Sequence, residues 1–151
     1  IVSYGNIPGE SVTSFSADYK VDDVAQDMGD ELIIGIGKLF GNNVKVEGDE
    51  RTRQMAAFME VPHQVQRNVT LIVPEGYEAD SENISQLNRN IVTPVGNFYV
   101  KAEINPDGNI VMQCIERYNT FYVQPQLWPK YLEVSDAAAN YNEAEIVLHK
   151  K

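Results

Sequence analysis

The sequence predicts a mainly β protein, an antiparallel β-sandwich with one helix near the C-terminus. The clearest evidence is residues 98–115, where apolar and polar residues alternate on both sides of the turn Pro106-Asp107-Gly108-Asn109. Such alternation around a Pro-Asp-Gly turn is typical of a β-hairpin. Alternation recurs at residues 13–21 and 64–73, whereas a helical period occurs once, late in the chain.

The first residues are expected to lead into a single domain. Residues 1–12, which contain glycine and proline, are interpreted as a linker or a first strand, and residues 13–151 as one sandwich-like domain. Residues 13–21 alternate as a half-buried strand with Phe15 on the apolar face. Residues 22–30 form an acidic connection with room for one helical turn.

The next segments continue the strand pattern. Residues 31–40 (ELIIGIGKLF) contain two glycines, which weaken a helix interior, and three isoleucines, which favour a strand. Gly41-Asn42-Asn43 is then a turn into a further strand at residues 44–46. Residues 53–61 and 64–73 also alternate and are predicted strands.

The second half begins with a turn at residues 74–77 (PEGY). Residues 78–90 are polar and are predicted to be a loop, with a short edge strand near Ile84–Leu87. Ile91–Val92 precede the hairpin, and its second strand is expected to extend through residues 117–123.

A helix is predicted after two prolines, Pro125 and Pro129, because proline is tolerated in a first helical turn. Apolar residues then recur every three or four positions: Leu127, Tyr131, Val134, Ala138 and Tyr141. Residues 145–149 are predicted to form a final strand.

Composition excludes several classes of function. The 151 residues can bury a core without disulfides, and a net charge of −10 argues against nucleic-acid binding and against anionic membrane surfaces. The single cysteine excludes an intrachain disulfide and a multi-cysteine zinc site. Because no apolar run approaches the ~20 residues of a membrane-spanning helix, no membrane insertion is expected.

Cys114 is the first candidate for a nucleophile, but alternation places it on the same strand face as Ile110 and Met112. A catalytic thiolate needs a nearby base, and the chain contains only His63 and His149. A buried structural thiol is therefore favoured, and no catalytic residue is assigned.

The densest acidic stretch runs from Asp18 to Glu31. A solvated acidic turn is favoured over a calcium site, because the spacing matches no EF-hand loop. Neither a metal site nor a cofactor is predicted.

Aromatic residues cluster late in the chain, at Tyr118, Phe121, Tyr122, Trp128 and Tyr131. Two interpretations remain open. The rings can pack the late helix onto the sheet, or they can stack on a sugar or peptide at a wet surface. In the second interpretation, the ligand-binding residues are Tyr118, Tyr122, Trp128 and Tyr131.

Several short motifs occur in a definite order along the chain. They are Arg53–Phe58, the Pro-Glu-Gly-Tyr strand end at Val73–Tyr77, Gly96–Phe98, Trp128–Tyr131 and Asn142–Leu148. In this order they resemble the C-terminal β domain of bacterial exported proteins with a central transglutaminase-like domain. The resemblance covers about residues 13–151.

The resemblance implies a periplasmic or cell-surface protein and a domain without activity of its own. The Cys, His and Asp of transglutaminase-like chemistry belong to the central domain, so no triad is carried over to this chain. We expect a non-catalytic accessory domain that packs against the neighbouring domain of the same polypeptide, with Leu127, Trp128 and Tyr131 as the docking surface. A start at Ile1 without methionine fits a piece of a longer protein. The alternative is a carbohydrate- or peptide-binding module.

Overall fold

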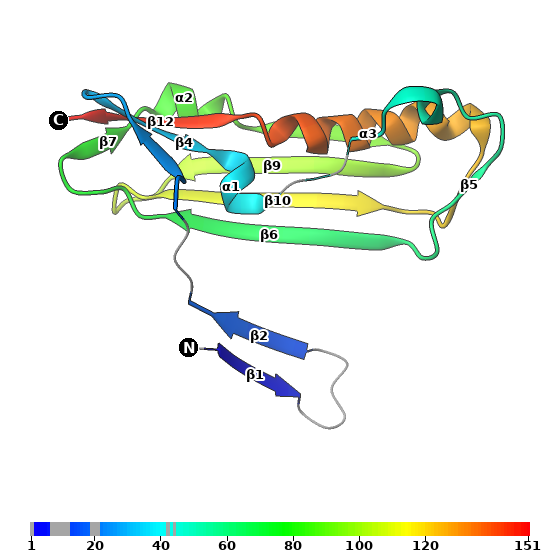
Figure 1. The fold of residues 1–151 in the computed structure, drawn as a ribbon, viewed down its shortest axis with the longest axis horizontal. Helices are drawn as coiled ribbons and strands as arrows, with labels where there is room; N and C mark the ends of the chain where they lie inside the picture. The colour runs from blue at the N-terminus through cyan, green and yellow to red at the C-terminus, as the bar shows by residue number, and fades with distance from the viewer. Residues whose placement is uncertain (1, 7–12, 19–21, 42, 44) are drawn as a thin grey trace.

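The computed structural model describes residues 2–6, 13–18, 22–41, 43 and 45–151 (Figure 1). Its largest sheet is antiparallel and four-stranded, with the strand order β6-β10-β9-β8. The strands of this first sheet are β6 (His63–Leu71), β8 (Arg89–Thr93), β9 (Gly96–Ile104) and β10 (Ile110–Tyr118).

A second antiparallel sheet joins distant parts of the sequence, in the order β3-β4-β12-β7. Its strands are β3 (Ala25–Asp27), β4 (Glu31–Gly35), β7 (Tyr77–Ala79) and β12 (Glu145–Lys150). The pairing of β12 with β4 aligns Ile146 with Ile34 and Leu148 with Leu32.

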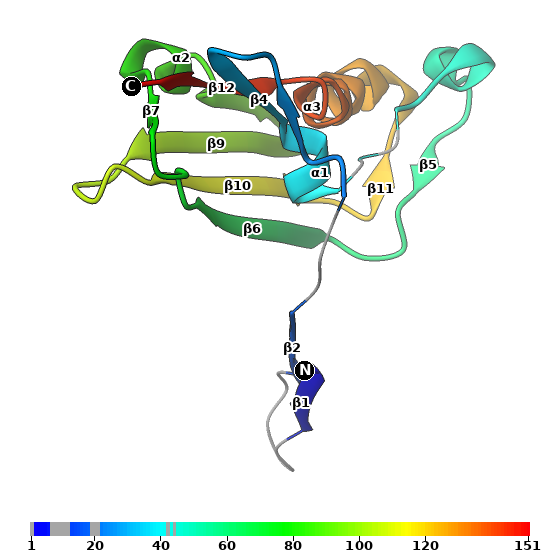
Figure 2. The ribbon, with the colours of Figure 1, turned by 60° about the vertical axis from the view of Figure 1, so that its left-hand side comes forward.

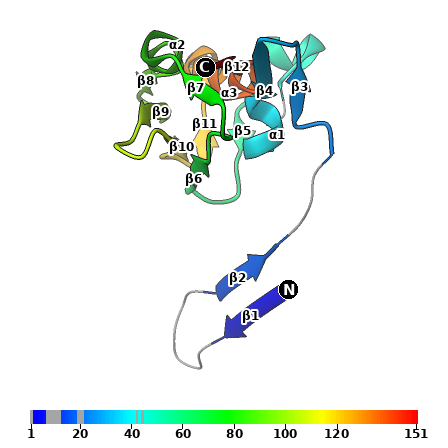
Figure 3. The ribbon, with the colours of Figure 1, turned by 90° about the vertical axis from the view of Figure 1, so that its left-hand side faces the viewer.

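The helices and the second sheet lie on one side of the first sheet (Figure 3). In Figure 1 the long helix α3 and strand β12 follow one another along that side. The helices are α1 (Ile36–Phe40), α2 (Ser81–Ser85), α3 (Trp128–Tyr141) and two 3₁₀ turns, Gly48–Thr52 and Pro125–Leu127. No described helix combines the length and the apolar content that crossing a bilayer requires.

The main core lies between the first sheet and this composite second layer. Alternate residues of β9 and β10 point into it, and the second sheet and α3 supply the other side. Its fully buried side chains include Ile36, Phe98, Val100, Ile110, Val134, Ile146 and Leu148. A smaller cluster, in which Trp128 contacts Ala57, Val95, Val123 and Leu132, closes one end of the molecule.

Two small sheets complete the described residues. Strands β1 (Val2–Asn6) and β2 (Thr13–Ala17) pair only with each other, apart from the main body in Figure 1. Strands β5 (Ala57–Phe58) and β11 (Tyr122–Val123) form the other. Residues 19–21 and the side chain of Phe15 lie outside the described part, so the burial expected there stays untested.

The predicted fold class is confirmed: the protein is mainly β, its sheets are antiparallel, and one long helix lies near the C-terminus. The hairpin at residues 98–115 is β9–β10, with Val100 and Met112 buried as expected. The turn at residues 74–77 is also present, with the Tyr77 amide donating to the Pro74 carbonyl at 3.1 Å.

Several local predictions were wrong. Residues 31–40 are a strand only to Gly35 and then continue as α1. The acidic connection contains the strand β3 instead of a helical turn. Of the strand predicted at residues 44–46, Lys45 and Val46 form no strand, and residue 44 lies outside the described residues.

Two other segments also differ from prediction. In residues 53–61 only β5 is a strand, and Met55 and Val61 are exposed. The predicted loop at residues 78–90 holds α2, where the Asp80 carboxylate accepts hydrogen bonds from the amides of Glu82 and Asn83.

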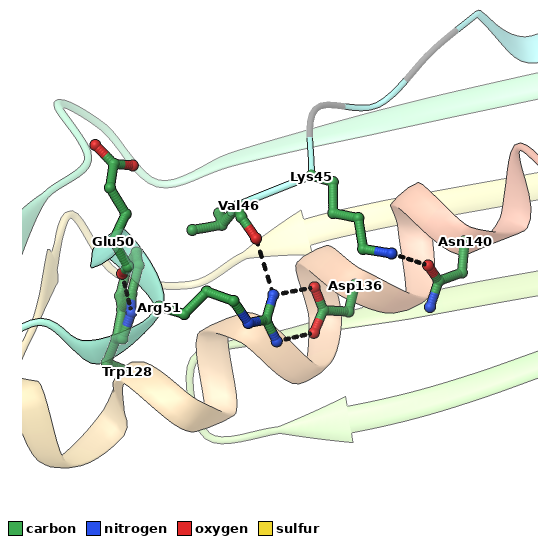
Figure 4. Close-up of polar contacts among 7 residues, drawn as sticks. All are labelled: Lys45, Val46, Glu50, Arg51, Trp128, Asp136 and Asn140. Atoms are coloured by element: carbon green, nitrogen blue, oxygen red, sulfur yellow. Dashed lines mark hydrogen bonds and ion pairs between the residues drawn. The ribbon is translucent and has the colours of Figure 1, made fainter. Parts of the chain in front are cut away.

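The connection from α1 to β5 is fastened to α3 by polar contacts (Figure 4). The Arg51 guanidinium donates two hydrogen bonds to the Asp136 carboxylate, at 2.9 and 2.7 Å, and a third to the Val46 carbonyl. Lys45 Nζ donates to Asn140 Oδ1 at 3.0 Å. The Arg51 hydrogen bond lowers the pKa of Asp136, so the carboxylate stays charged in this contact.

Candidate functional site

The predicted aromatic residues form a row beside the N-terminal end of α3. The Trp128 and Tyr131 rings stack with centroids 4.7 Å apart and planes 12° apart, and the Tyr118 ring lies 5.0 Å from Tyr131. His63 extends the row, 5.3 Å from Tyr118, while the Arg53 guanidinium lies 5.1 Å from the Trp128 ring. The row thus joins residues from β6, β10 and α3.

The polar atoms of the row are already used within the protein. Trp128 Nε1 donates to the Glu50 carbonyl at 2.8 Å, and the Tyr118 hydroxyl donates to the Glu116 carboxylate at 2.9 Å. Burial raises the pKa of Tyr118 and of Tyr131, and the Glu116 charge adds to both shifts. Both phenols therefore remain neutral at physiological pH.

Three of the four predicted ligand-binding residues are brought together, and one is not. Tyr118 and Trp128 are buried and Tyr131 is half-buried, which favours packing of α3 onto the sheet. Tyr122 lies on β11 and, within the described part of the chain, makes no ring contact with the other three. Ligand binding by these four residues stays a prediction.

The predicted docking surface is wrong, because not all of its residues are exposed. Trp128 and Tyr131 face the smaller core cluster, so of the expected residues only Leu127 is exposed at the surface. Other apolar residues are exposed nearby, on the two-stranded sheet and beside it.

We call this surface the β5–β11 patch, and it lies at the end of the molecule remote from β7 (Figure 2). Phe58 and Tyr122 are cross-strand partners whose side chains point outward, while their neighbours Ala57 and Val123 are buried beneath them. The Phe58 and Phe121 rings meet edge to face at 6.2 Å. The exposed members are Met55 (81% exposed), Phe58 (69%), Val61 (62%), Phe121 (51%), Tyr122 (50%) and Leu127 (36%).

Cys114 is buried, as predicted, in the middle of the first sheet. Burial raises the pKa of its thiol to about 11, and the neighbouring Arg67 charge offsets only part of this effect. Arg67 is its cross-strand partner, whereas His63 pairs with Tyr118 at the far end of the same two strands, about 13 Å along the strand. His149 lies on the second sheet, 3.5 Å from the Glu31 carboxylate. Neither histidine is placed to activate the thiol.

Replacing Cys114 with alanine is expected to lower the free energy of unfolding by about 1–2 kcal/mol, because it removes a small buried side chain. The native thiol should react slowly with a thiol reagent, and the denatured chain should react fast. Urea denaturation and a thiol titration check both statements. Rapid modification of the native protein would contradict them.

The acidic stretch gathers no metal ligands in the part that the structure describes, where no group of three or more histidine, cysteine or acidic side chains is close enough to hold an ion. Asp27 instead accepts a hydrogen bond from the Gly29 amide at 2.8 Å, within the turn from β3 to β4.

Comparison with known proteins adds no relative: no protein-family model matches the chain, and neither the curated proteins nor the solved structures include a significant match.

Proposed function

We propose that this chain is a non-catalytic accessory domain that packs against a neighbouring domain of the same polypeptide through the β5–β11 patch. The observation that carries the proposal is the set of exposed apolar side chains on two short paired strands and in the segments that flank them. Contiguous exposed apolar surface is typical of interaction sites.

The patch is suited to docking because it is held on a packed base. Ala57 and Val123 are buried against Trp128, and the Met59 amide donates to the Phe121 carbonyl at 2.7 Å. The outward rings are therefore positioned before a partner arrives, which reduces the entropy lost on association. Burying a large apolar side chain contributes roughly 1.5–3 kcal/mol before the costs of association.

The identity of the neighbour rests on the resemblance described above. We propose that it is a transglutaminase-like domain of an exported bacterial protein, located in the periplasm or at the cell surface. In this proposal the reaction belongs to that domain, and this chain positions or shields it. The burial of Cys114 supports a non-catalytic role for this chain.

Hydrogen exchange tests the docking surface. In the full polypeptide encoded by the reading frame, amides of residues 55–61 and 121–127 should exchange more slowly than in this chain alone, by about tenfold if docking contributes about 1.4 kcal/mol. Phe58→Glu should remove that protection. The matched control is Val92→Glu, since Val92 is 73% exposed on β8, outside the patch.

Two outcomes would contradict this function. The first is equal exchange of both segments in the full polypeptide and in the isolated chain. The second is a reading frame that encodes no further domain.

A ligand-binding module is the second candidate function, and a specific observation favours it. Shallow hollows lie over the open face of the first sheet, and polar side chains, among them Asn68, Asn90 and Gln113, line them. This face differs from the aromatic row that the sequence predicted as the ligand-binding surface.

A further inference from the structure

The first sheet has one face in the core and one face open. Alternation sends Phe98, Val100 and Met112 inward, and the helices and the second sheet cover only that side (Figure 3). The outward residues form four rows across β6, β10, β9 and β8. The rows are Thr70-Val111-Glu103, Asn68-Gln113-Lys101, Gln66-Ile115-Tyr99-Asn90 and Gln64-Arg117-Asn97-Val92.

Carboxamides are the commonest polar side chains of these rows, although acidic residues outnumber basic residues in the chain. The chain has 22 aspartates and glutamates against 12 lysines and arginines. Among the described outward positions of this sheet, Glu103 is the one carboxylate, and it pairs with Lys101 at 2.6 Å. The carboxamides of the face are Gln64, Gln66, Asn68, Asn90, Asn97 and Gln113.

The hydrogen-bonding capacity of these amides is largely free. Asn68 Oδ1 accepts long bonds from Gln66 Nε2 at 3.4 Å and from Gln113 Nε2 at 3.3 Å, which orient the three groups across two strands. Each carboxamide has two donor hydrogens and an acceptor oxygen with two lone pairs. Sugar hydroxyls both donate and accept hydrogen bonds, so this side-chain chemistry suits them.

An apolar strip lies between the amides. Ile115 and Tyr99 are half-buried neighbours in one row, with Gln66 on one side and Asn90 on the other. The C–H face of a sugar ring packs well on such a surface, and amphipathic aromatic rings suit wet contacts. The four rows extend about 20 Å along the strands.

The face has two shallow hollows, one beside Asn68 and Gln113 and one beside Asn90 and Tyr99. One hollow of about 330 Å³ is lined by Asn68, Lys101, Val111 and Gln113, and another of about 320 Å³ by Asn90, Tyr99 and Lys101. Lys101 borders both, so the two hollows adjoin across the sheet.

We propose that this open face binds a neutral oligosaccharide chain, with Asn68, Gln113 and Gln66 as hydrogen-bonding residues and Tyr99 and Ile115 as the surface beneath the sugar rings. Charge complementarity selects the ligand. With Lys101 and Glu103 paired, the charges that remain among the described residues of this face are Arg117 and Arg89, which lines the second hollow, and two arginines are too few for a polyanion. The proposal is independent of the β5–β11 patch, which lies elsewhere on the molecule.

Isothermal titration calorimetry of the chain with neutral hexasaccharides (of glucose, mannose and galactose) tests the proposal. We expect binding that is unchanged between low and high salt, because neutral hydrogen bonds are not screened. Asn68→Ala and Gln113→Ala should each weaken binding by about 3- to 10-fold, the range for a lost neutral hydrogen bond. Gln26→Ala is the matched control, an exposed amide on β3 of the other sheet, and it should leave binding unchanged.

Two further measurements separate sugar binding on this face from docking through the β5–β11 patch. Amide NMR shifts should localise to β6, β9 and β10, and Phe58→Glu should not affect binding, so a failure of docking and a failure of sugar binding are distinguishable. The proposal is overturned if none of the neutral hexasaccharides binds, or if the shifts localise to Trp128 and Tyr131. Binding confined to an acidic hexasaccharide and lost at high salt, or to a neutral peptide, would also overturn it.

Discussion

Phe98→Ala is expected to lower the free energy of unfolding by about 3–5 kcal/mol, the range for truncating a fully buried phenylalanine. Phe98 is the largest fully buried side chain, and its ring meets Tyr141 of α3 edge to face at 5.6 Å. Alanine would leave a cavity between the first sheet and α3, where both sides are already fixed by other contacts. Since small domains are stable by only about 5–15 kcal/mol, this loss is a large fraction of the total stability.

Urea denaturation of the two proteins measures this loss. Phe121→Ala is the matched control, because the same atoms are removed from a side chain that is 51% exposed. The control should cost less than about 1 kcal/mol in the isolated chain. A loss below about 2 kcal/mol for Phe98→Ala would show that the core rearranges to fill the space.

Gly96→Ala is expected to have a comparable effect for a different reason, the close approach of two backbones. A methyl group at Gly96 would overlap the Arg117 carbonyl oxygen, and it would lie 3.2 Å from the Arg117 carbonyl carbon and 3.3 Å from Tyr118 Cα. These are backbone atoms of the paired strand β10, which cannot move without disturbing the sheet. We expect a loss of about 3 kcal/mol, at the upper end for overpacked sites.

The melting temperatures of Gly96→Ala and Gly108→Ala provide the comparison. Gly108 has a positive φ of 79°, but its surroundings are open within 4 Å, so alanine there meets only local backbone strain of about 1–2 kcal/mol. A larger loss at Gly108 than at Gly96 would contradict the close-approach explanation.

The parts of the fold that the sequence predicts well are those in which local pattern and tertiary environment agree. The β9–β10 hairpin has polar residues facing solvent, apolar residues facing the core, and a turn that closes locally. Helix α3 has an apolar period of which Val134, Ala138 and Tyr141 lie on its buried face. Neither element requires knowledge of distant residues.

Other segments were mispredicted because their local hydrophobic pattern does not identify their structure. Helix α2 is polar and short, and its one local signal is Asp80, whose side chain caps the helix. Residues 53–61 alternate, but Met55 and Val61 are exposed, so alternation there does not reflect burial. At residues 36–40 the chain turns into a helix despite Gly37, and the Gly37 amide donates to the Asn142 carbonyl of a distant segment.

The candidate sites also differ in how far the sequence predicts them. The aromatic cluster was visible in the sequence because its members lie close in the chain, and packing of these rings between the late helix and the sheet was one of the two interpretations. The carboxamide face was missed because its residues were counted only as the solvent side of each strand. The arrangement of Gln66, Ile115, Tyr99 and Asn90 in one row depends on strand order and register, which no single segment encodes.

The two sheets differ in the length of chain that each must close, and this difference has a consequence for how the protein folds. Strands β8, β9 and β10 follow one another through tight turns, whereas β12 pairs with β4 across about 110 positions. Local hairpins form faster than such distant pairings, so β8, β9 and β10 should pair early and β12 should join late. Until β12 takes its place between β4 and β7, the inner face of the first sheet lacks the cover of Ile146 and Leu148. During synthesis, the chain is therefore most vulnerable to proteolysis and aggregation just before its final strand becomes available.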